Sequence, residues 1–397
     1  MKKIKKGIKG ITLVALVVTI IVLLILSGVA ISLSIGEDGI FKRAQDASKI
    51  YENASQNELI DIEKVSNYIE DYFNKKVDDI KISDIIGGDI LENTTKVKDT
   101  NGEIFFVPGG FKVSEETENE INKGIVIQDI EGNEFVWVPV QNIGEMIINS
   151  NEDIILDNVS KSTRTYSNLR IRELDKTKFS MVKPGDITSS REPDILRDYD
   201  TKEEYYKGIL GFNTVDDMAD SMIKEYNNML NSINKYNGFY VGRYELTGSI
   251  SEPTVKKGKV LTTQEAGNWY YLYRSCNNMI NTMYAKTTMI YGCQWDEICE
   301  WLKECGFDTD NDSSKWGNYS NTGGTDEPTG SNEKWQANKI YDLAGNHWEF
   351  TQEAYSTNYR VGRAGAFGST SPAADRNIDT PISLDTADTT RVTLYIK

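Results

Sequence analysis

The segment YDLAGNHWEF, residues 341–350, combines several side chains that can do chemistry within a few positions. Asn346 and Glu349 offer oxygen atoms of the kind that ligate calcium, or that cap backbone groups in a turn. Gly345 can adopt a positive φ that other residues resist, and Trp348 can anchor a core with its ring. The motif therefore predicts either a calcium site at Asn346 and Glu349 or a well-packed, hydrogen-bonded turn.

Two features near this motif are weaker candidates for a functional site. His347 is the single histidine of the chain, it has no triad partner in view, and we interpret it as structural. The segment DTDNDSSKWGNY, residues 308–319, begins like a calcium loop because acids alternate at its start. It has Ser313 where such a loop has glycine and Tyr319 where it has an acid. We interpret this segment as a solvated acidic loop.

The N-terminal residues have the charge pattern of a membrane anchor. The basic stretch MKKIKKGIKG precedes residues 11–34, which carry no charge. Roughly 20 apolar residues in a helix cross the ~30 Å hydrocarbon layer, so this run is long enough to span. Lysines stay on the cytoplasmic side, which places the rest of the chain outside. A cleaved secretory signal is the alternative, but no small-x-small site ends the run cleanly.

A Lys-Gly pair ending at Gly10, followed by Ile-Thr-Leu and an apolar run, resembles the class III signal of type IV pilin-like proteins. The resemblance implies a leader over 1–10, a cut by prepilin peptidase between Gly10 and Ile11, and a transmembrane anchor over 11–34. The family usually has a glutamate five residues past the cut, where this chain has Ala15. We therefore expect membrane-tethered display rather than assembly into a long fibre.

Periodicity predicts the elements that must position these residues. Apolar spacings of three and four between Phe41 and Tyr72 indicate one face of an amphipathic helix. We predict a stalk helix over 35–76, with a coiled-coil or core helix as the alternative, and a linker over 77–103. Beyond it, alternation and turn residues predict a hairpin over 124–140, a strand from Gly238, helices over 218–233, 267–279 and 291–302, a loop-rich insertion at about 141–201, and a final strand with Val392, Leu394 and Ile396 on one face.

The 341–350 motif looks like the GNxWEW signature of the formylglycine-generating enzyme domain, which has a C-type-lectin-like fold. The resemblance extends from FVWVPV through GFYVGRYE and YGCQWDEICEWL to RVGRAGAFGS, and covers roughly residues 104–397. It implies an α+β fold class, in which an N-terminal transmembrane and stalk helix precedes a C-type-lectin-like domain. In the family the asparagine and glutamate of the signature help to coordinate calcium, which implies the same role for Asn346 and Glu349.

Cysteines decide whether the family's oxidase chemistry is expected here. The family's oxidases use a cysteine pair just past an Arg-Gly-Gly segment, where this chain has RAGAFGSTS and no cysteine after Cys305. Without that thiolate there is neither a nucleophile nor a copper ligand, so we predict that the chain is not an enzyme. No CxxC spacing supports zinc, and any disulfide pairing outside the cell stays open. Cys299 shares a helical face with apolar residues, which predicts burial; the four cysteines are Cys276, Cys293, Cys299 and Cys305.

Residues 363–391 resemble the terminal region of the variable proteins of diversity-generating retroelements, which are lectin-like proteins of this type. In those proteins, error-prone copying of adenines rewrites selected codons while framework residues stay. The resemblance implies framework roles for Arg363, Gly365, Pro372, Arg376, Pro381 and Arg391. It implies that the diversified, ligand-binding positions are Ala366, Phe367, Asp375, Asn377, Ile378, Asp379, Thr380, Ile382, Ser383, Leu384, Asp385, Ala387 and Asp388. A solvated tail loop without a partner is the alternative.

Composition and these resemblances lead to three hypotheses. The net charge of −16 argues against nucleic acid as a partner. The first hypothesis is a single-pass cell-membrane protein, anchored through 11–34, whose extracellular domain binds a protein or other surface ligand through 363–391 and requires no cofactor besides any calcium. The second is a structural minor pilin in a pilus-associated assembly. The third is a formylglycine-type oxidoreductase with lost or relocated cysteines.

Overall fold

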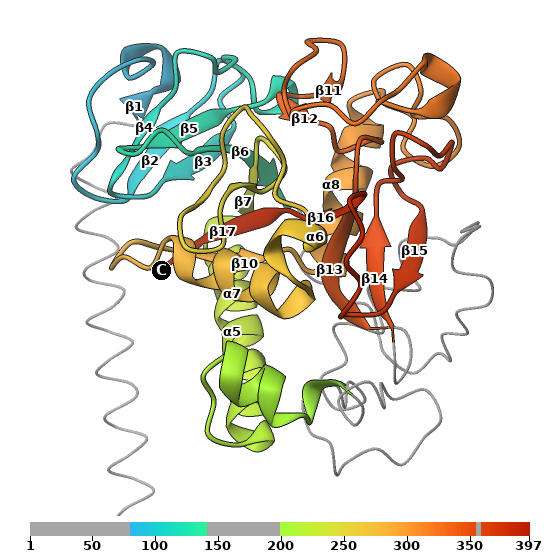
Figure 1. Cartoon of the computed structure of the whole chain (residues 1–397). Helices are drawn as coiled ribbons and strands as arrows, with labels where there is room; N and C mark the ends of the chain where they lie inside the picture. Colours follow the sequence, from blue (N-terminus) through green and yellow to red (C-terminus); the bar gives the residue numbers. More distant parts are fainter. Residues whose placement is uncertain (1–79, 141–198, 355–358) are drawn as a thin grey trace, which may run out of the picture. The chain divides into compact units, whose positions relative to one another are not determined.

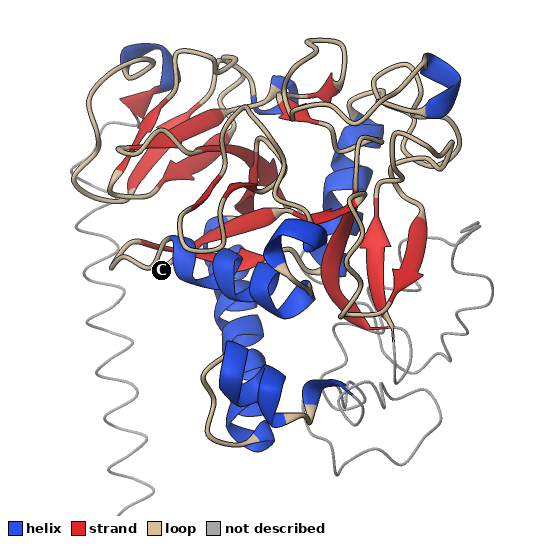
Figure 2. Cartoon of the chain, in the orientation of Figure 1, coloured by secondary structure: helices blue, strands red, loops and turns tan. Residues whose placement is uncertain are grey.

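The computed structural model describes residues 80–140, 199–354 and 359–397, which form a mixed α+β fold with a large share of sheet (Figures 1 and 2). The predicted leader, cleavage site, membrane anchor and stalk, and nearly all of the predicted insertion, lie outside these residues. Within the described ranges, no helix combines the length and the apolar content that crossing a bilayer requires.

The largest sheet has six strands, and the C-terminal strand lies inside it rather than at an edge. All of its pairings are antiparallel. The hairpin predicted over 124–140, the strand from Gly238 and the final strand are confirmed. In spatial order the strands are β10 (Ala285–Met289), β17 (Val392–Ile396), β7 (Gly238–Gly242), β6 (Glu134–Pro139), β5 (Val126–Asp129) and β4 (Phe111–Val113).

This sheet separates two apolar cores because side chains alternate between its faces. Trp137 and Tyr240, paired across β6 and β7, belong to one core, while Val136 and Val241 belong to the other. Helix α7 (Trp269–Met279) contributes to the first core and helix α8 (Gly292–Glu304) to the second. The strands of this sheet are therefore buried on both faces, which explains their nearly continuous apolar runs.

The three predicted helices in the described ranges are confirmed with small shifts of their ends. Helix α5 (Val215–Tyr236) starts at Thr214, whose hydroxyl accepts from the amide of Asp217 at 3.0 Å while the Asp217 carboxylate accepts from the Thr214 amide at 3.1 Å. This capping box explains why the helix begins there. The remaining helical elements are α6 (Thr263–Ala266), the 3₁₀ turns η1 (Ile82–Asp84), η2 (Ile121–Lys123) and η7 (Ser320–Thr322), and a π-helical segment η6 (Glu204–Ile209).

The linker predicted over 77–103 is wrong for residues 80–103. Strands β1 (Ile80–Lys81), β2 (Thr95–Lys98) and β3 (Ile104–Val107) form a three-stranded sheet of their own. Val97 of β2 lies opposite Phe105 of β3, and both side chains are fully buried in the first core. Short strands separated by polar turns resemble a linker in composition, and only the packing of their few apolar residues distinguishes them.

A second, four-stranded sheet contains much of the predicted variable region. In order it consists of β15 (Arg376–Asp379), β14 (Arg360–Arg363), β13 (Trp348–Ala354) and β16 (Asp388–Thr390). β16 runs parallel to β13, and the other neighbours are antiparallel. The segment 363–391 is therefore not a loop throughout, because two stretches of it are paired strands. Two small hairpins complete the fold, β8 (Thr247–Gly248) with β9 (Pro253–Thr254) and β11 (Gln336–Ala337) with β12 (Ile340–Tyr341).

Tryptophan burial differs from the sequence expectation. Trp348 of the 341–350 motif is only half-buried, so it does not anchor the core as predicted. Trp295 of α8 is fully buried instead, and its indole N–H donates to the carbonyl of Ala373 at 2.9 Å. This tryptophan therefore joins the second core to the backbone of residues 363–391.

We predict that Trp295→Ala lowers the free energy of unfolding by about 3–5 kcal/mol, because a large ring leaves a cavity and a lost hydrogen bond. Trp348→Ala serves as a matched control and should cost clearly less, because its ring is half-exposed. Urea unfolding of the full chain measures both values. Equal losses would contradict the assignment of Trp295 as the anchoring ring.

Candidate functional site

The 341–350 motif forms the turn between β12 and β13. Gly345 has φ +78°, and a side chain there would lie 2.1 Å from the carbonyl oxygen of Asn318. The backbone of this turn bonds to two other segments: the Gly345 amide donates to the Ala364 carbonyl at 3.0 Å, and the Asn346 amide donates to the Asn318 carbonyl at 2.9 Å. The predicted structural role of glycine at this position is confirmed, because no other residue fits both the φ and the space.

Glu349 is fully buried and pairs with the guanidinium of Arg391. Its two oxygens accept from Arg391 Nη2 at 2.5 Å and from Nε at 2.8 Å, which is a bidentate pair. Arg391 also donates to the carbonyl oxygens of Gly242 and Tyr341, each at 3.0 Å. Both carboxylate oxygens predicted to ligate calcium thus accept from a protein cation. The pair joins the motif to the start of the last strand.

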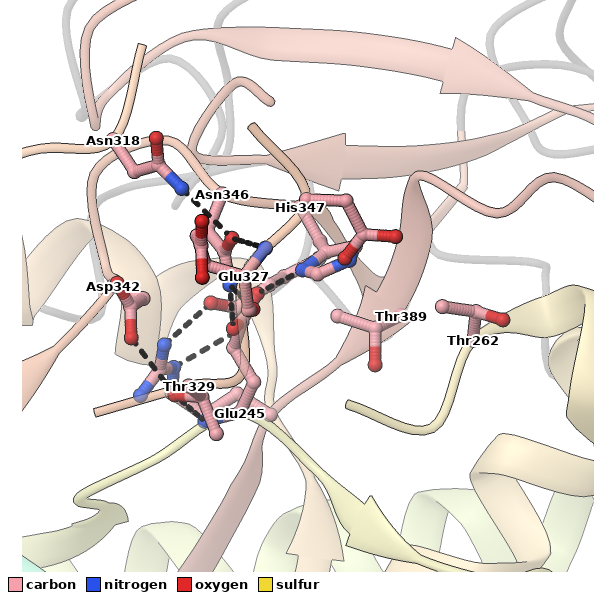
Figure 3. A network of polar contacts seen from close by, with 12 residues as sticks. Glu245, Thr262, Asn318, Glu327, Thr329, Asp342, Asn346, His347 and Thr389 are labelled. Atoms are coloured by element: carbon pink, nitrogen blue, oxygen red, sulfur yellow. Dashed lines mark hydrogen bonds and ion pairs between the residues drawn. The ribbon is translucent and has the colours of Figure 1, made fainter. Parts of the chain in front are cut away.

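Asn346 has a separate set of partners (Figure 3). Its amide nitrogen donates to Glu245 Oε2 at 2.6 Å and to the carbonyl of Glu327 at 3.2 Å. Its amide oxygen accepts from Asn318 Nδ2 at 3.0 Å and from the Glu327 amide at 3.3 Å. Asn346 and Glu349 thus each have their own protein hydrogen-bond partners in the structure. Calcium binding by this pair stays a prediction.

His347 lies beside the same Glu245, which the sequence analysis had not singled out (Figure 3). Its Nδ1 is 3.1 Å from Glu245 Oε1 and its Nε2 is 3.3 Å from Asp326 Oδ1. Burial lowers the pKa of the imidazole, but these two carboxylates outweigh that effect and raise the pKa above its ordinary value. Burial and the nearby Glu245 raise the pKa of Asp342 to about 7. Buried acids and one histidine thus form a connected polar network beneath the surface.

A cavity of about 460 Å³ opens beside this network. Its lining includes His347 and Asp326 from the network side, Lys259 and Glu265 from the segment around α6, and Thr386 from the terminal segment. Lys259 and Glu265 form an exposed ion pair at 2.5 Å. The cavity is therefore lined both by the 341–350 motif and by residue Thr386 of the C-terminal region, and most of its lining residues are polar or charged.

Three arginines predicted as framework residues are fully buried and paired with carboxylates. Arg363 donates to Asp296 at 2.8 Å and to Glu353 at 3.1 Å. Arg376 donates to the same oxygen of Asp296 at 2.7 Å, so one aspartate of α8 holds two strands of the second sheet. Arg391, the third, pairs with Glu349 as described above. The framework prediction for these arginines agrees with their burial.

Position 365, two residues after Arg363, requires glycine because of its backbone conformation. It has φ +79°, and a side chain there would lie 2.6 Å from the Ser371 carbonyl oxygen. Arg360 adds a fourth buried pair that the sequence analysis had not included, with both oxygens of Asp200 at 3.1 Å. These contacts fix the backbone at the beginning of residues 363–391.

The positions predicted to contact ligand divide into three groups by exposure. The exposed side chains are Ile382, Leu384 and Asp385. The half-buried side chains are Phe367, Asn377, Ile378, Asp379, Thr380, Ser383 and Ala387. The buried side chains are Ala366, Asp375 and Asp388. The last three do not form part of an exposed binding surface, because strand pairing or neighbouring turns cover them.

The exposed stretch is held to the body by backbone contacts. Its Pro381 carbonyl accepts from the amide of Trp269 at 2.8 Å, and its Asp385 carbonyl accepts from the Thr263 hydroxyl at 2.8 Å. We call residues 380–387 the terminal ribbon. Along the terminal ribbon the side chains of Ile382, Leu384, Asp385 and Thr386 are exposed, while the backbone carbonyls of Pro381 and Asp385 are bonded to the body.

All four cysteines are free thiols, and three of them are fully buried. Burial raises the pKa of Cys276, of Cys299 (to about 12) and of the half-buried Cys305. Cys299 packs in the second core, which confirms its prediction as a small apolar residue. None of the four pairs in a disulfide.

The sequence analysis missed the acids that neutralise the arginines. Asp296 lies on α8 beside apolar residues, and Glu245 follows β7. The available signal was a charged residue inside an otherwise apolar helical face, since a buried acid needs a basic or hydrogen-bonding partner. That signal does not reveal which arginine is the partner.

Comparison with known proteins gives limited similarity. No protein-family model matches the sequence, and no curated protein matches it. Two solved structures are similar in backbone: Treponema denticola variable protein 1, at 14% identity and a TM-score of 0.29, covering 40% of this chain and 84% of that one, and CarF, at 13% identity and a TM-score of 0.31, covering 41% and 88%. Both TM-scores lie below 0.5, so the fold and the site rest on the contacts described above.

We predict that Arg391→Met costs about 3–5 kcal/mol of unfolding free energy, because it leaves the buried Glu349 charge without a partner. The double variant Arg391→Met/Glu349→Leu should recover most of that loss, since an apolar pair replaces the ion pair. Lys259→Met, in an exposed pair, is the control and should change stability by less than about 1 kcal/mol. Urea unfolding tests this, and a single-variant loss below about 1 kcal/mol would overturn it.

The His347 network predicts a pH-dependent stability. The folded pKa of His347 lies above its unfolded value of 6.5, so its stabilisation is complete below pH 6.5 and is lost as pH rises through the folded pKa. The melting temperature of the wild type should therefore exceed that of His347→Gln by more at pH about 6 than at pH about 8.5. A difference that stays constant over this range would show that the imidazole is neutral throughout.

Proposed function

We propose that this chain is a non-catalytic ligand-binding protein that presents the terminal ribbon to a macromolecular partner. One observation carries the proposal: buried arginine–carboxylate pairs fix both sides of the ribbon while Ile382, Leu384 and Asp385 between them are exposed. A rigid backbone with free side chains binds without the entropy loss of ordering a loop. The same arrangement lets these side chains change while the fold persists.

The distribution of exposed apolar side chains supports this choice of surface. Large apolar side chains are exposed at six positions in the described part of the chain, and three of these lie in this region: Tyr359 just before β14, and Ile382 and Leu384 on the terminal ribbon. Leu384 is 59% exposed. Apolar side chains next to a carboxylate such as Asp385 make the mixed surface that protein interfaces use. A protein ligand fits this chemistry better than a small polar molecule.

The proposal includes two further parts: the chain has a C-type-lectin-like fold, and a retroelement diversifies the codons of its terminal region. The exposure pattern supports a shorter variable set than the sequence implied, without Ala366, Asp375 and Asp388, because these three side chains are buried. A near-duplicate of codons 363–391 beside a reverse transcriptase gene, with differences confined to template adenines, would support this mechanism. Differences spread over the codons of Arg363, Arg376 and Arg391 would contradict it.

The setting that we propose is the cell surface. The pilin-like signal, the prepilin peptidase cut at Gly10 and the anchor over 11–34 would tether the chain, with the described residues outside the cell. Cleavage at Gly10 followed by recovery in purified fibres would instead favour the structural minor pilin. Cysteine burial supports a non-catalytic role over the oxidoreductase, because buried thiols with raised pKa are poor nucleophiles.

We predict that the ribbon variant Ile382→Ser/Leu384→Ser/Asp385→Asn loses binding at least about tenfold while its melting temperature changes by less than about 3 °C. The probe is an array of purified cell-surface proteins and glycans, screened first with the wild-type full chain. The control replaces exposed apolar residues elsewhere, as Ile104→Ser/Ile130→Ser/Met283→Ser.

Binding that survives the ribbon variant, or that both triple variants lose equally, would sink the proposal. A large fall in melting temperature of the ribbon variant would also contradict it, because the three side chains would then belong to the core. Failure of the wild type to bind any member of the array would count against a macromolecular ligand of these classes.

A further inference from the structure

Three aspartates converge where the terminal ribbon leaves β15 and enters β16. Asp379 is the last residue of β15, Asp388 is the first residue of β16, and Asp385 lies on the ribbon between them. Each offers a carboxylate oxygen, and no two of these oxygens are more than 4.8 Å apart. That limit is twice the ~2.4 Å distance between calcium and its oxygen ligands, so any two of these oxygens are close enough to share one ion, and small side-chain rotations bring the third into reach.

Asp388 supplies a second and separate observation. Its side chain is 5% exposed, and its Oδ2 has no hydrogen-bond partner in the described part of the chain. No lysine, arginine or histidine of the described residues forms an ion pair with Asp388, Asp379 or Asp385. The Ser383 hydroxyl interacts with this side chain, but its Oδ2 and its negative charge have no protein partner among the described residues. A buried carboxylate without a counter-charge is costly, and native proteins usually pair such groups or use them to ligate a metal.

The two other carboxylates are already oriented by the ribbon backbone. Asp379 Oδ1 accepts from the amide of Thr380 at 2.6 Å, and Asp385 Oδ1 accepts from the amide of Ala387 at 2.8 Å. Each therefore keeps its second oxygen for another partner. Each buried arginine described above has a carboxylate within hydrogen-bond distance. The three aspartates have no such partner of opposite charge among the described residues.

We propose that Asp379, Asp385 and Asp388 form a binding site for a calcium ion that fastens the two ends of the terminal ribbon to each other. Calcium suits the site better than magnesium, because it accepts irregular sets of six to eight oxygens at longer distances. Water completes the shell on the side of the exposed Asp385. This inference does not depend on whether the ribbon binds a macromolecule, and it gives Asp379, Asp385 and Asp388 a metal-binding role that is separate from the predicted ligand contact.

The protonation of the cluster without an ion agrees with the proposal. Burial, together with the charges of Asp379 and Asp385, raises the pKa of Asp388 to about 8, while the Ser383 hydroxyl acts in the opposite direction. The three acids thus compete for a proton when no cation is present. A divalent ion replaces that proton, so calcium binding should release a proton and strengthen as pH rises.

The direct test is calorimetric titration of calcium chloride alone into the EDTA-treated full chain, near neutral pH. We expect one site with a dissociation constant of about 10⁻⁴–10⁻³ M, the range of extracellular calcium modules. Asp388→Asn should weaken binding at least about tenfold, because it removes the buried ligand charge. The matched control is Asp312→Asn in the exposed acidic loop, which should bind as the wild type does.

Melting temperatures provide a second readout that is independent of the measured affinities, and they also show whether each variant folds. In EDTA, Asp388→Asn should melt at or above the wild-type temperature, since it removes a buried acid that lies next to two other carboxylates. In about 10 mM calcium the wild type should gain roughly 2–4 °C and Asp388→Asn should gain less than about 1 °C. Asp385→Asn, at an exposed position, gives a second variant that folds and should also reduce the gain.

Three outcomes would overturn the proposal. The first is a wild type that neither releases heat nor shifts its melting temperature at about 10 mM calcium. The second is Asp388→Asn that binds calcium as tightly as the wild type. The third is Asp312→Asn that loses binding as strongly as Asp388→Asn, which would place the ion on the general acidic surface.

Discussion

Arginine side chains buried against carboxylates hold the second sheet and the terminal ribbon in place. One oxygen of Asp296 accepts hydrogen bonds from both Arg363 and Arg376, and the two oxygens of Glu349 accept hydrogen bonds from Arg391. Such pairs are costly to desolvate, and removing Arg391 leaves the buried Glu349 without its cation. Their planar geometry also fixes direction, which an apolar contact does not do. These pairs therefore hold the backbone at both ends of the ribbon, so the ribbon does not depend on contacts within itself.

This constraint separates the side chains that hold the fold from those that face solvent. Leu384 and Asp385 lie a few residues from Arg376 and Arg391, yet the former are exposed and the latter fully buried. Because the anchoring contacts are made by arginines and by backbone groups such as the Pro381 carbonyl, exposed side chains can differ without loss of packing. A protein that must recognise a partner with a changeable surface needs this separation.

The polar groups beneath the surface connect the ribbon to the 341–350 motif. Glu245 bonds to both Asn346 and His347, and His347 lies beside Asp326 at the cavity that Thr386 also lines. Burial and the charge of Glu245 raise the pKa of Asp342 to about 7, and nearby carboxylates raise the pKa of His347, so the charge of this region changes with pH. Because Thr386 lines the same cavity as His347 and Asp326, charged groups lie beside the ribbon.

Local pattern predicted the regular elements of this protein well, because alternation and helical spacing record which faces are buried. The hairpin over 124–140, the three helices and the last strand follow from that pattern, and the framework arginines followed from spacing within a resemblance. The acids that pair with those arginines did not, since Asp296 is 67 positions from Arg363 and 80 from Arg376. Tertiary packing also decided that Trp348 is half-exposed, that Glu349 meets a guanidinium, and that Asp388 is buried while Leu384 is not. Contacts between distant segments set these outcomes, and no local period encodes which distant segment a side chain will meet.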